Sequence, residues 1–158
     1  MQALEGDLSP PTGRFAIVAA KFNRALVDRL VDGALGAFQK AGVRESAIDL
    51  VRVPGSFEIP LVCQELAAAG KYAAIVALGA VIRGDTDHYA YVCQAVTQGV
   101  LDANLATGVP VIFGVLTCET EEQALARAGG AEGNKGADAA LAAIEMANLL
   151  KKLPGANQ

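Results

Sequence analysis

The chain has few of the residues that build metal centres, disulfide frameworks or aromatic surfaces. Its 158 residues include one histidine, three cysteines and no tryptophan, and aromatic residues make up 5%. Cys63, Cys93 and Cys118 are widely spaced and show neither a CxxC pair nor the spacing of a metal site. We therefore expect reduced thiols, a cytoplasmic location and no bound metal.

The sequence also lacks an excess of positive charge and any apolar run of transmembrane length. A formal net charge of −4 makes nucleic acid and anionic membranes poor partners. Because no basic segment followed by an apolar stretch stands at the N-terminus, we expect no signal peptide. The 53% of hydrophobic residues is a composition typical of a globular protein.

Short apolar runs alternate along the chain with segments of helical periodicity. The expected strands are residues 14–20, 47–53, 72–78 and 109–116, and the expected helices are 24–41, 57–69, 89–107, 121–127 and 137–153. Continuous apolar strands are typical of a parallel sheet with helices on both faces. We predict an α/β fold, a three-layer αβα sandwich with a central four-stranded parallel sheet and flavodoxin-like topology.

The length of the chain suits a single domain, which we place at residues 14–153. Residues 1–13 are polar and contain Pro10-Pro11, so they are expected to form an N-terminal arm. Residues 154–158 follow the last helix as a C-terminal tail. In parallel α/β folds ligands bind beyond the carboxyl ends of the strands, so the loops after the four strands are the candidate sites.

The most informative loop is the one after the third strand, within residues 79–89. Gly84 allows close approach of the backbone to a ligand, Thr86 offers a hydroxyl, and His88 is the only histidine. Free amides at the start of the next helix suit an anion such as phosphate. A histidine there either transfers protons or has a structural role at the helix start, and these residues alone leave the two readings about even.

The loops after the first two strands each allow two readings. Phe22 follows the first strand, where it either stacks on a flat heterocycle or packs under the next helix; no glycine-rich phosphate loop stands there. Ser56 and Glu58 follow the second strand. Capping of the next helix explains both, whereas the functional alternative is that Glu58 and backbone amides bind the hydroxyls of a polyol.

The end of the chain adds an aromatic residue and two cations. Phe113 lies within the fourth strand and is most simply a core residue. Arg127 and Lys135 flank the glycine-rich residues 128–134. They are either solvated charges at helix ends or the source of positive charge for a bound phosphate.

Together these blocks resemble the 6,7-dimethyl-8-ribityllumazine synthase family. The matching blocks are Phe22-Asn23, residues 54–60, 79–89, 110–117, and Arg127 with residues 134–136, in family order. One block is weak evidence, but five in order are specific. Two departures are small: Lys21 stands where arginine is common, and position 85 varies among members.

The resemblance implies a transferase without metal or cofactor. It would condense 5-amino-6-(D-ribitylamino)uracil with 3,4-dihydroxy-2-butanone 4-phosphate to 6,7-dimethyl-8-ribityllumazine, releasing phosphate and water, in the penultimate step of riboflavin biosynthesis. His88 would transfer protons. The implied contacts to ribitylaminouracil are Phe22, Ser56, Phe57, Glu58, Ala80, Val81, Ile82 and Phe113. The implied phosphate contacts are Asp85, Thr86 and Arg127, and Asn23 and Lys135 are additional candidates.

The resemblance also implies a homo-oligomer, a pentamer that in many members joins into a sixty-subunit icosahedral shell. Sites in the family lie between subunits, so Phe113, Arg127 and Lys135 would come from the adjacent chain. The short glycine-containing loop between Arg127 and Lys135 favours the shell, and riboflavin synthase is a candidate partner. Two alternatives are a module that holds a flavin or lumazine without making it, and a phosphosugar enzyme of another α/β family.

Overall fold

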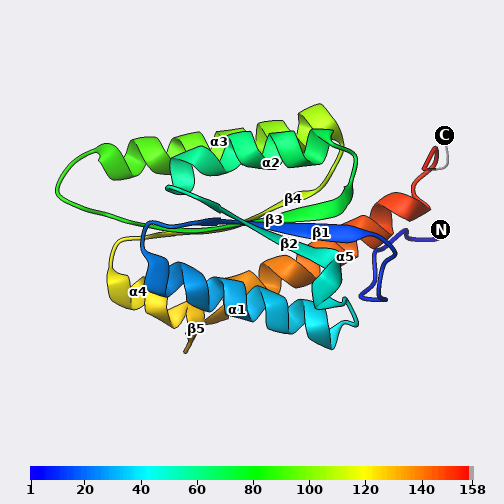
Figure 1. Ribbon diagram of the computed structural model, residues 1–158, viewed down its shortest axis with the longest axis horizontal. Coiled ribbons are helices and arrows are strands. Elements are labelled where there is room, and N and C mark those ends of the chain that lie inside the picture. The colour runs from blue at the N-terminus through cyan, green and yellow to red at the C-terminus, as the bar shows by residue number, and fades with distance from the viewer. Residues whose placement is uncertain (157–158) are drawn as a thin grey trace.

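Four parallel strands form the centre of the computed structural model, which describes residues 1–156 (Figure 1). They are β1 (Arg14–Ala20), β2 (Ile48–Val53), β3 (Tyr72–Ile82) and β4 (Val111–Cys118). The strands pair in the order β2-β1-β3-β4, and every pair is parallel. This order is that of flavodoxin-like folds, so the predicted sheet is confirmed.

Helices cover both faces of the sheet. α2 (Ile59–Ala68) and α3 (His88–Thr107) lie on one face, and α1 (Arg24–Lys40), α4 (Glu121–Ala126) and α5 (Lys135–Lys152) lie on the other (Figure 1). The three-layer αβα arrangement is therefore confirmed. Among residues 1–156, the helices fall short of the length and apolarity needed to cross a membrane.

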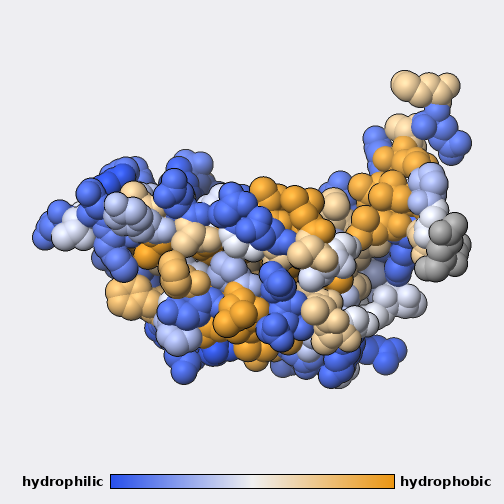
Figure 2. Space-filling model, turned by 90° about the horizontal axis from the view of Figure 1, so that it is seen from above, coloured by the Kyte–Doolittle hydropathy of each residue, from blue (hydrophilic) through white to orange (hydrophobic). Residues whose placement is uncertain are grey.

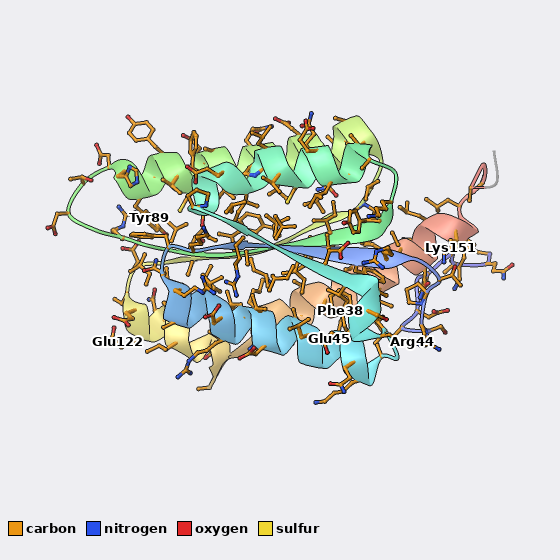
Figure 3. The ribbon with its side chains drawn as sticks, in the orientation of Figure 1. Phe38, Arg44, Glu45, Tyr89, Glu122 and Lys151 are labelled. Carbon is orange, nitrogen blue, oxygen red and sulfur yellow. The ribbon has the colours of Figure 1, made fainter. Side chains whose placement is uncertain are left out.

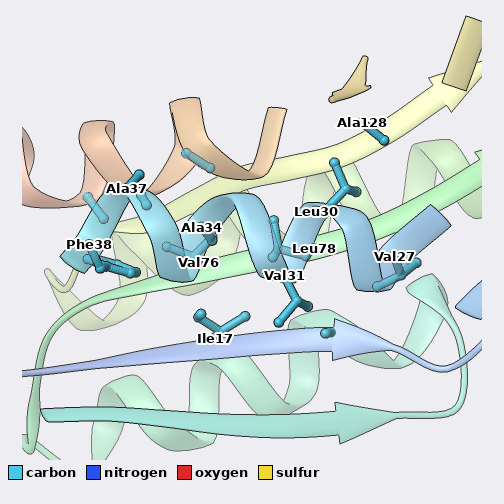
Figure 4. Close-up of a cluster of buried hydrophobic side chains, with 14 of the residues drawn as sticks. Ile17, Val27, Leu30, Val31, Ala34, Ala37, Phe38, Val76, Leu78 and Ala128 are labelled. Atoms are coloured by element: carbon cyan, nitrogen blue, oxygen red, sulfur yellow. The ribbon is translucent and has the colours of Figure 1, made fainter. Parts of the chain in front are cut away.

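The sheet divides the core into two halves, because successive strand residues face opposite layers. Phe15 and Ile17 of β1 belong to the half beneath α1 and α5, whereas Ala16 and Val18 belong to the half beneath α2 and α3. Figure 4 shows the first half, where α1 directs a stripe of apolar side chains toward β1 and β3. Phe38 closes one end of this stripe, with its ring centroid 4.9 Å from that of Phe15.

The third strand is longer than the sequence predicts. We expected it to end at residue 78, but pairing with β4 continues from Gly79 opposite Val115 to Ile82 opposite Cys118. Glycine is unfavourable in strands, yet β3 continues through Gly79. A Cβ added at Gly79 would lie 2.5 Å from the hydroxyl oxygen of Ser56, so glycine is required there by packing.

Other boundaries also differ from the prediction. A 3₁₀ turn, η1 (Glu45–Ala47), precedes β2, and a second turn, η2 (Ser56–Glu58), occupies the expected start of the second helix. The helix predicted to end at residue 127 ends at Ala126. Residues 128–134 form β5 (Ala128–Gly130) and β6 (Gly133–Asn134), a short antiparallel pair, where we expected a loop. The tail expected at 154–158 extends beyond the described residues, which exclude 157 and 158.

The arm expected at residues 1–13 has no helix or strand and is held against α5. The side-chain amide of Asn148 donates to the backbone oxygens of Asp7 (2.9 Å) and Ser9 (2.8 Å). Lys152 forms an ion pair with Asp7, with Nζ and Oδ2 3.2 Å apart. Hydrogen bonds from the Ser9 backbone and the Lys152 side chain lower the pKa of Asp7.

The three cysteines are free thiols. Cys63 and Cys118 are buried and Cys93 is half-buried. Burial raises the pKa of all three thiols, that of Cys63 to about 12. Since the thiolate is the reactive form, these residues are poor nucleophiles at neutral pH.

Asn134 joins the two long helices of the α1 and α5 layer. Its side-chain oxygen accepts hydrogen bonds from the backbone N–H groups of Gly136 (2.9 Å) and Ala137 (3.1 Å), which caps α5. Its Nδ2 donates to the backbone oxygen of Arg29 in α1, at 3.1 Å. Gly33 leaves space for this side chain, because a Cβ there would overlap it.

We expect Asn134→Ala to lower the free energy of unfolding by about 2 kcal/mol, because it removes a helix cap and the bond to α1 together. Urea denaturation at a single protein concentration measures the loss. Gln98→Ala is the control, since it removes one exposed amide bond to Asp102 (2.8 Å) and should cost only about 0.3 kcal/mol. Equal losses in the two variants would contradict the role of Asn134.

Candidate active site

A pocket of about 710 Å³ opens at the carboxyl ends of β1, β2 and β3. Its volume lies in the range of small-molecule sites. The lining residues come from the loops after these strands and from the start of α3. They are Phe22, Pro54, Gly55, Ser56, Phe57, Glu58, Ala80, Val81, Ile82, Gly84, Thr86, His88, Tyr89 and Val92.

Most of the candidate residues predicted from the sequence lie together in this pocket. Those that line it are Phe22, Ser56, Phe57, Glu58, Ala80, Val81, Ile82, Thr86 and His88. Those that do not are Asn23, Asp85, Phe113, Arg127 and Lys135. Tyr89 and Val92 line the pocket although we had assigned them no role. Helical periodicity gives a signal for Val92, because it stands four residues after His88 and shares its face of α3.

Phe22 presents an exposed ring at the pocket. The backbone pairing of β1 with β2 continues past the strands, because Lys21 N donates to Val53 O (2.7 Å) and Phe22 N to Pro54 O (3.0 Å). This pairing holds Phe22 beside the loop after β2, and 71% of the residue is exposed. The reading in which Phe22 packs under a helix is therefore wrong. Phe57 lines the same pocket and is 61% exposed.

Ser56 and Glu58 have different roles in the turn after β2. The expected cap by Ser56 is wrong, since its side chain makes no capping bond and is buried against Gly79. Glu58 does support the turn, because its Oε2 accepts from the backbone N–H of Gly55 at 3.0 Å. The carboxylate is nevertheless exposed and lines the pocket, so the structural and ligand-binding readings of Glu58 are compatible.

Asn23 lies behind the pocket and connects two strand ends. Its Nδ2 donates to the backbone oxygen of Ala80 at 2.7 Å. It is the one non-glycine residue within 1–156 with a positive φ, 57°, which is the left-handed region. Asparagine tolerates this conformation better than most residues. Asn23 therefore turns the chain from β1 into α1 and holds the end of β3.

The loop between β3 and α3 consists of exposed residues that carry few hydrogen bonds. Arg83 N donates to Cys118 O at 2.9 Å, which fixes the start of the loop. Thr86 Oγ1 accepts weakly from His88 N at 3.4 Å. Asp87 precedes α3 without a capping side-chain bond. The backbone N–H of Ala90 donates to Asp87 O at 3.0 Å. In general the first amides of a helix lack partners in the preceding turn and suit an anion.

Tyr89 is a partly buried phenol at the pocket. Burial raises its pKa, and the neighbouring Cys93 thiol raises it further. Arg83 opposes this effect because its guanidinium lies over the phenol ring. Tyr89 is thus a neutral phenol at physiological pH. Figure 3 shows it at the end of α3 nearest the loop.

Phe113, Arg127 and Lys135 lie outside the pocket of their own chain. Phe113 is in the middle of the edge strand β4, opposite Ala77, and packs against the core beneath α2 and α3. Arg127 follows α4, and its NH1 donates to the backbone oxygen of Gln123 at 3.0 Å. Lys135 begins α5, and both cations are exposed.

The fold and the pocket define an α/β protein of flavodoxin-like topology with a small-molecule-sized site at the carboxyl edge of its sheet. A model of the 6,7-dimethyl-8-ribityllumazine synthase family matches residues 12–151. The chain belongs to this family.

Relatives that bear the name 6,7-dimethyl-8-ribityllumazine synthase include the following three. The protein of Halorhodospira halophila is 54% identical over 97% of this chain and 99% of its own. That of Desulfotalea psychrophila is 53% identical over 95% of this chain and 97% of its own. That of Xanthomonas oryzae pv. oryzae is 51% identical over 98% of this chain and all of its own.

We expect Asn23→Ala to be less stable than Asn23→Gly by about 1 kcal/mol, although both lose the bond to Ala80. The reason is that alanine bears the cost of the left-handed conformation and glycine does not. Urea denaturation of both variants gives the difference. An alanine variant as stable as the glycine variant would show that the backbone at residue 23 relaxes out of this conformation.

Proposed function

We propose that this chain condenses 5-amino-6-(D-ribitylamino)uracil with 3,4-dihydroxy-2-butanone 4-phosphate to form 6,7-dimethyl-8-ribityllumazine, releasing phosphate and water. The observation that carries the proposal is the convergence of three loops on one pocket. They bring an exposed aromatic ring, a carboxylate and the only histidine together, as Phe22, Glu58 and His88. Family membership supports the choice of substrates.

The end of β3 is suited to bind the polar edge of the pyrimidine ring. Pairing with β1 stops at Leu78, while pairing with β4 continues to Ile82. The Ala80 carbonyl points to the β1 side, since it accepts from Asn23. Because strand backbone groups alternate in direction, those of Ile82 point to the same side, beyond the end of β1. Phe22 would stack on the ring plane.

The ribityl chain would lie along the turn after β2. Glu58 offers exposed carboxylate oxygen to the hydroxyl groups, and Ser56 and Phe57 line the same wall of the pocket. The phosphate of the second substrate would bind at residues 84–86, through loop amides, the Thr86 hydroxyl and the positive end of the α3 dipole. Asp85 would bind the phosphate through its backbone N–H group.

The chemistry needs no nucleophile from the protein, because the substrate amine attacks the carbonyl of the second substrate. The protein would mainly hold the two substrates in contact, which can lower the barrier by roughly 7–11 kcal/mol. Imine formation, phosphate elimination and ring closure each move protons. His88 would assist these transfers, with an effect of about 10²–10⁴-fold.

The test is to mix the purified protein with both substrates and follow the fluorescent lumazine. We expect product above the uncatalysed rate, and His88→Ala should slow turnover by about 10²–10⁴-fold, leaving activity that comes from positioning. Absence of product would favour a module that only binds a flavin or lumazine. Unchanged turnover of His88→Ala at saturating substrates would remove His88 from the proton transfers.

We further propose a cytoplasmic homo-oligomer with sites between subunits. Support comes from exposed apolar side chains on the outer surface of the α2 and α3 layer, which a lone subunit would leave in water. They are Leu61, Tyr91, Leu101 and Leu105. Figure 2, seen from the side of this layer, shows apolar areas among the polar ones. A pentamer, and from it a sixty-subunit shell, would cover such surfaces, and riboflavin synthase is a candidate partner.

In this assembly Arg127 would bind the phosphate in the pocket of an adjacent subunit, with Phe113 and Lys135 close to it. Co-expression of His88→Ala and Arg127→Ala chains tests the arrangement. If a site takes the two residues from different chains, about one quarter of the sites in randomly mixed oligomers are intact, and activity exceeds that of either variant alone. If both residues come from one chain, no site is intact. Sedimentation gives the mass and distinguishes a pentamer from a shell.

A further inference from the structure

Arg83 and Tyr89 join the two ends of the loop that connects β3 to α3. Arg83 is the first residue after β3, and Tyr89 is the second residue of α3. The guanidinium carbon of Arg83 lies 4.4 Å from the centroid of the Tyr89 ring, a cation–π contact. On its other side, Arg83 Nε forms an ion pair with Glu119 Oε2 at 2.7 Å.

We propose that this contact is a clamp that holds residues 84–88 in the conformation that binds the phosphate of the second substrate. Arg83 is a positioning residue in this proposal, because it acts through the loop. The proposal rests on the proposed function and adds residues to which neither the sequence nor the family resemblance gave a role. Gly84 and Thr86 lie inside the clamped segment, and His88 immediately precedes Tyr89.

The loop needs such a clamp because it makes few contacts of its own. Every residue from Arg83 to His88 is exposed, and the Thr86 bond to His88 N is long, at 3.4 Å. Gly84 adds backbone freedom that must be lost on ordering. A guanidinium that lies over a ring at the far end of the loop removes part of that freedom before the ligand binds.

Glu119 holds the guanidinium over the ring. The ion pair is exposed, so it adds little stability by itself, but it fixes the orientation of the guanidinium. Glu119 is itself held in place, because its backbone N–H donates to Gln123 Oε1 at 2.9 Å. The clamp thereby connects the loop to the end of β4 and to α4.

The charge of Arg83 provides a competing explanation that the test must separate. Asp85 and Asp87 stand in the same loop, and Arg83 is the only permanent cation between β3 and α3. Its loss would weaken an anion site even without a clamp. Arg83→Lys distinguishes the two effects, because it keeps the charge and loses the planar guanidinium that contacts both the Tyr89 ring and Glu119.

The experiment measures KM for each substrate in Arg83→Met, Arg83→Lys, Tyr89→Leu and Tyr89→Phe. The clamp predicts a rise of roughly three- to tenfold in KM for the phosphate substrate in the first three, with KM for ribitylaminouracil unchanged. Tyr89→Phe keeps the ring, so its KM for the phosphate substrate should stay close to that of the unaltered protein. The double variant Arg83→Met/Tyr89→Leu should be no worse than Arg83→Met, because both changes break one contact.

Lys152→Met is the matched control. It removes an ion pair to Asp7 whose lysine has the same side-chain exposure as Arg83, 44%, at the opposite end of the sheet. It should leave both KM values unchanged. The clamp is refuted if Arg83→Lys behaves as the unaltered protein, if both KM values rise together, or if the effects of the two single changes multiply.

A second experiment measures the binding of inorganic phosphate by calorimetry. It tests the clamp without relying on lumazine formation, and hence independently of the proposed function. If the unaltered protein makes no lumazine, the proposed function fails and the calorimetry still tests the clamp. The expected result is three- to tenfold weaker phosphate binding in Tyr89→Leu and Arg83→Lys than in the unaltered protein. Equal binding by all three proteins, or no binding by the unaltered protein, would overturn the clamp.

Discussion

The site depends on a step in the sheet, where β3 runs on beside β4 after its pairing with β1 has stopped. Hydrogen bonds to β4 keep the last residues of β3 extended as far as Ile82. On the opposite side, the chain turns away at Asn23, whose side chain replaces the missing strand partner at Ala80. Because β1 no longer pairs with it, the end of β3 faces the pocket, and its residues 80–82 form the floor of the pocket. Phe22 after β1, the turn η2 after β2 and His88 at the start of α3 surround this floor.

The layer of α1 and α5 supports this edge by close packing of small residues. Gly33 and Gly136 allow the two helices to approach until Asn134 spans them with hydrogen bonds to both. Dense packing of this kind resists deformation. The loop between β3 and α3 has no such packing, because residues 83–88 are all exposed and depend on local contacts.

The sequence predicted the layers and most of the pocket because both follow from local patterns. Apolar strands and helical periodicity gave the sandwich, and loops at one edge of a parallel sheet had to lie close together. The errors arose where tertiary contacts outweighed local preference. Gly79 continues a strand because Ser56 fills the space of a side chain, and the β5–β6 pair depends on chain reversal at glycines. Arg83 contacts Tyr89, which is 6 residues away in the sequence, and Glu119, which is 36 residues away. No periodicity in the sequence indicates these contacts.

The two exposed phenylalanine rings at the pocket mouth have a thermodynamic consequence. Phe22 and Phe57 stand mostly in water in the empty site. A flat ligand that covers them removes apolar surface from water, so its binding carries a negative heat-capacity change. The enthalpy of binding then becomes more favourable as temperature rises while the entropy becomes less so, and the affinity varies only gently over the range in which the fold is stable.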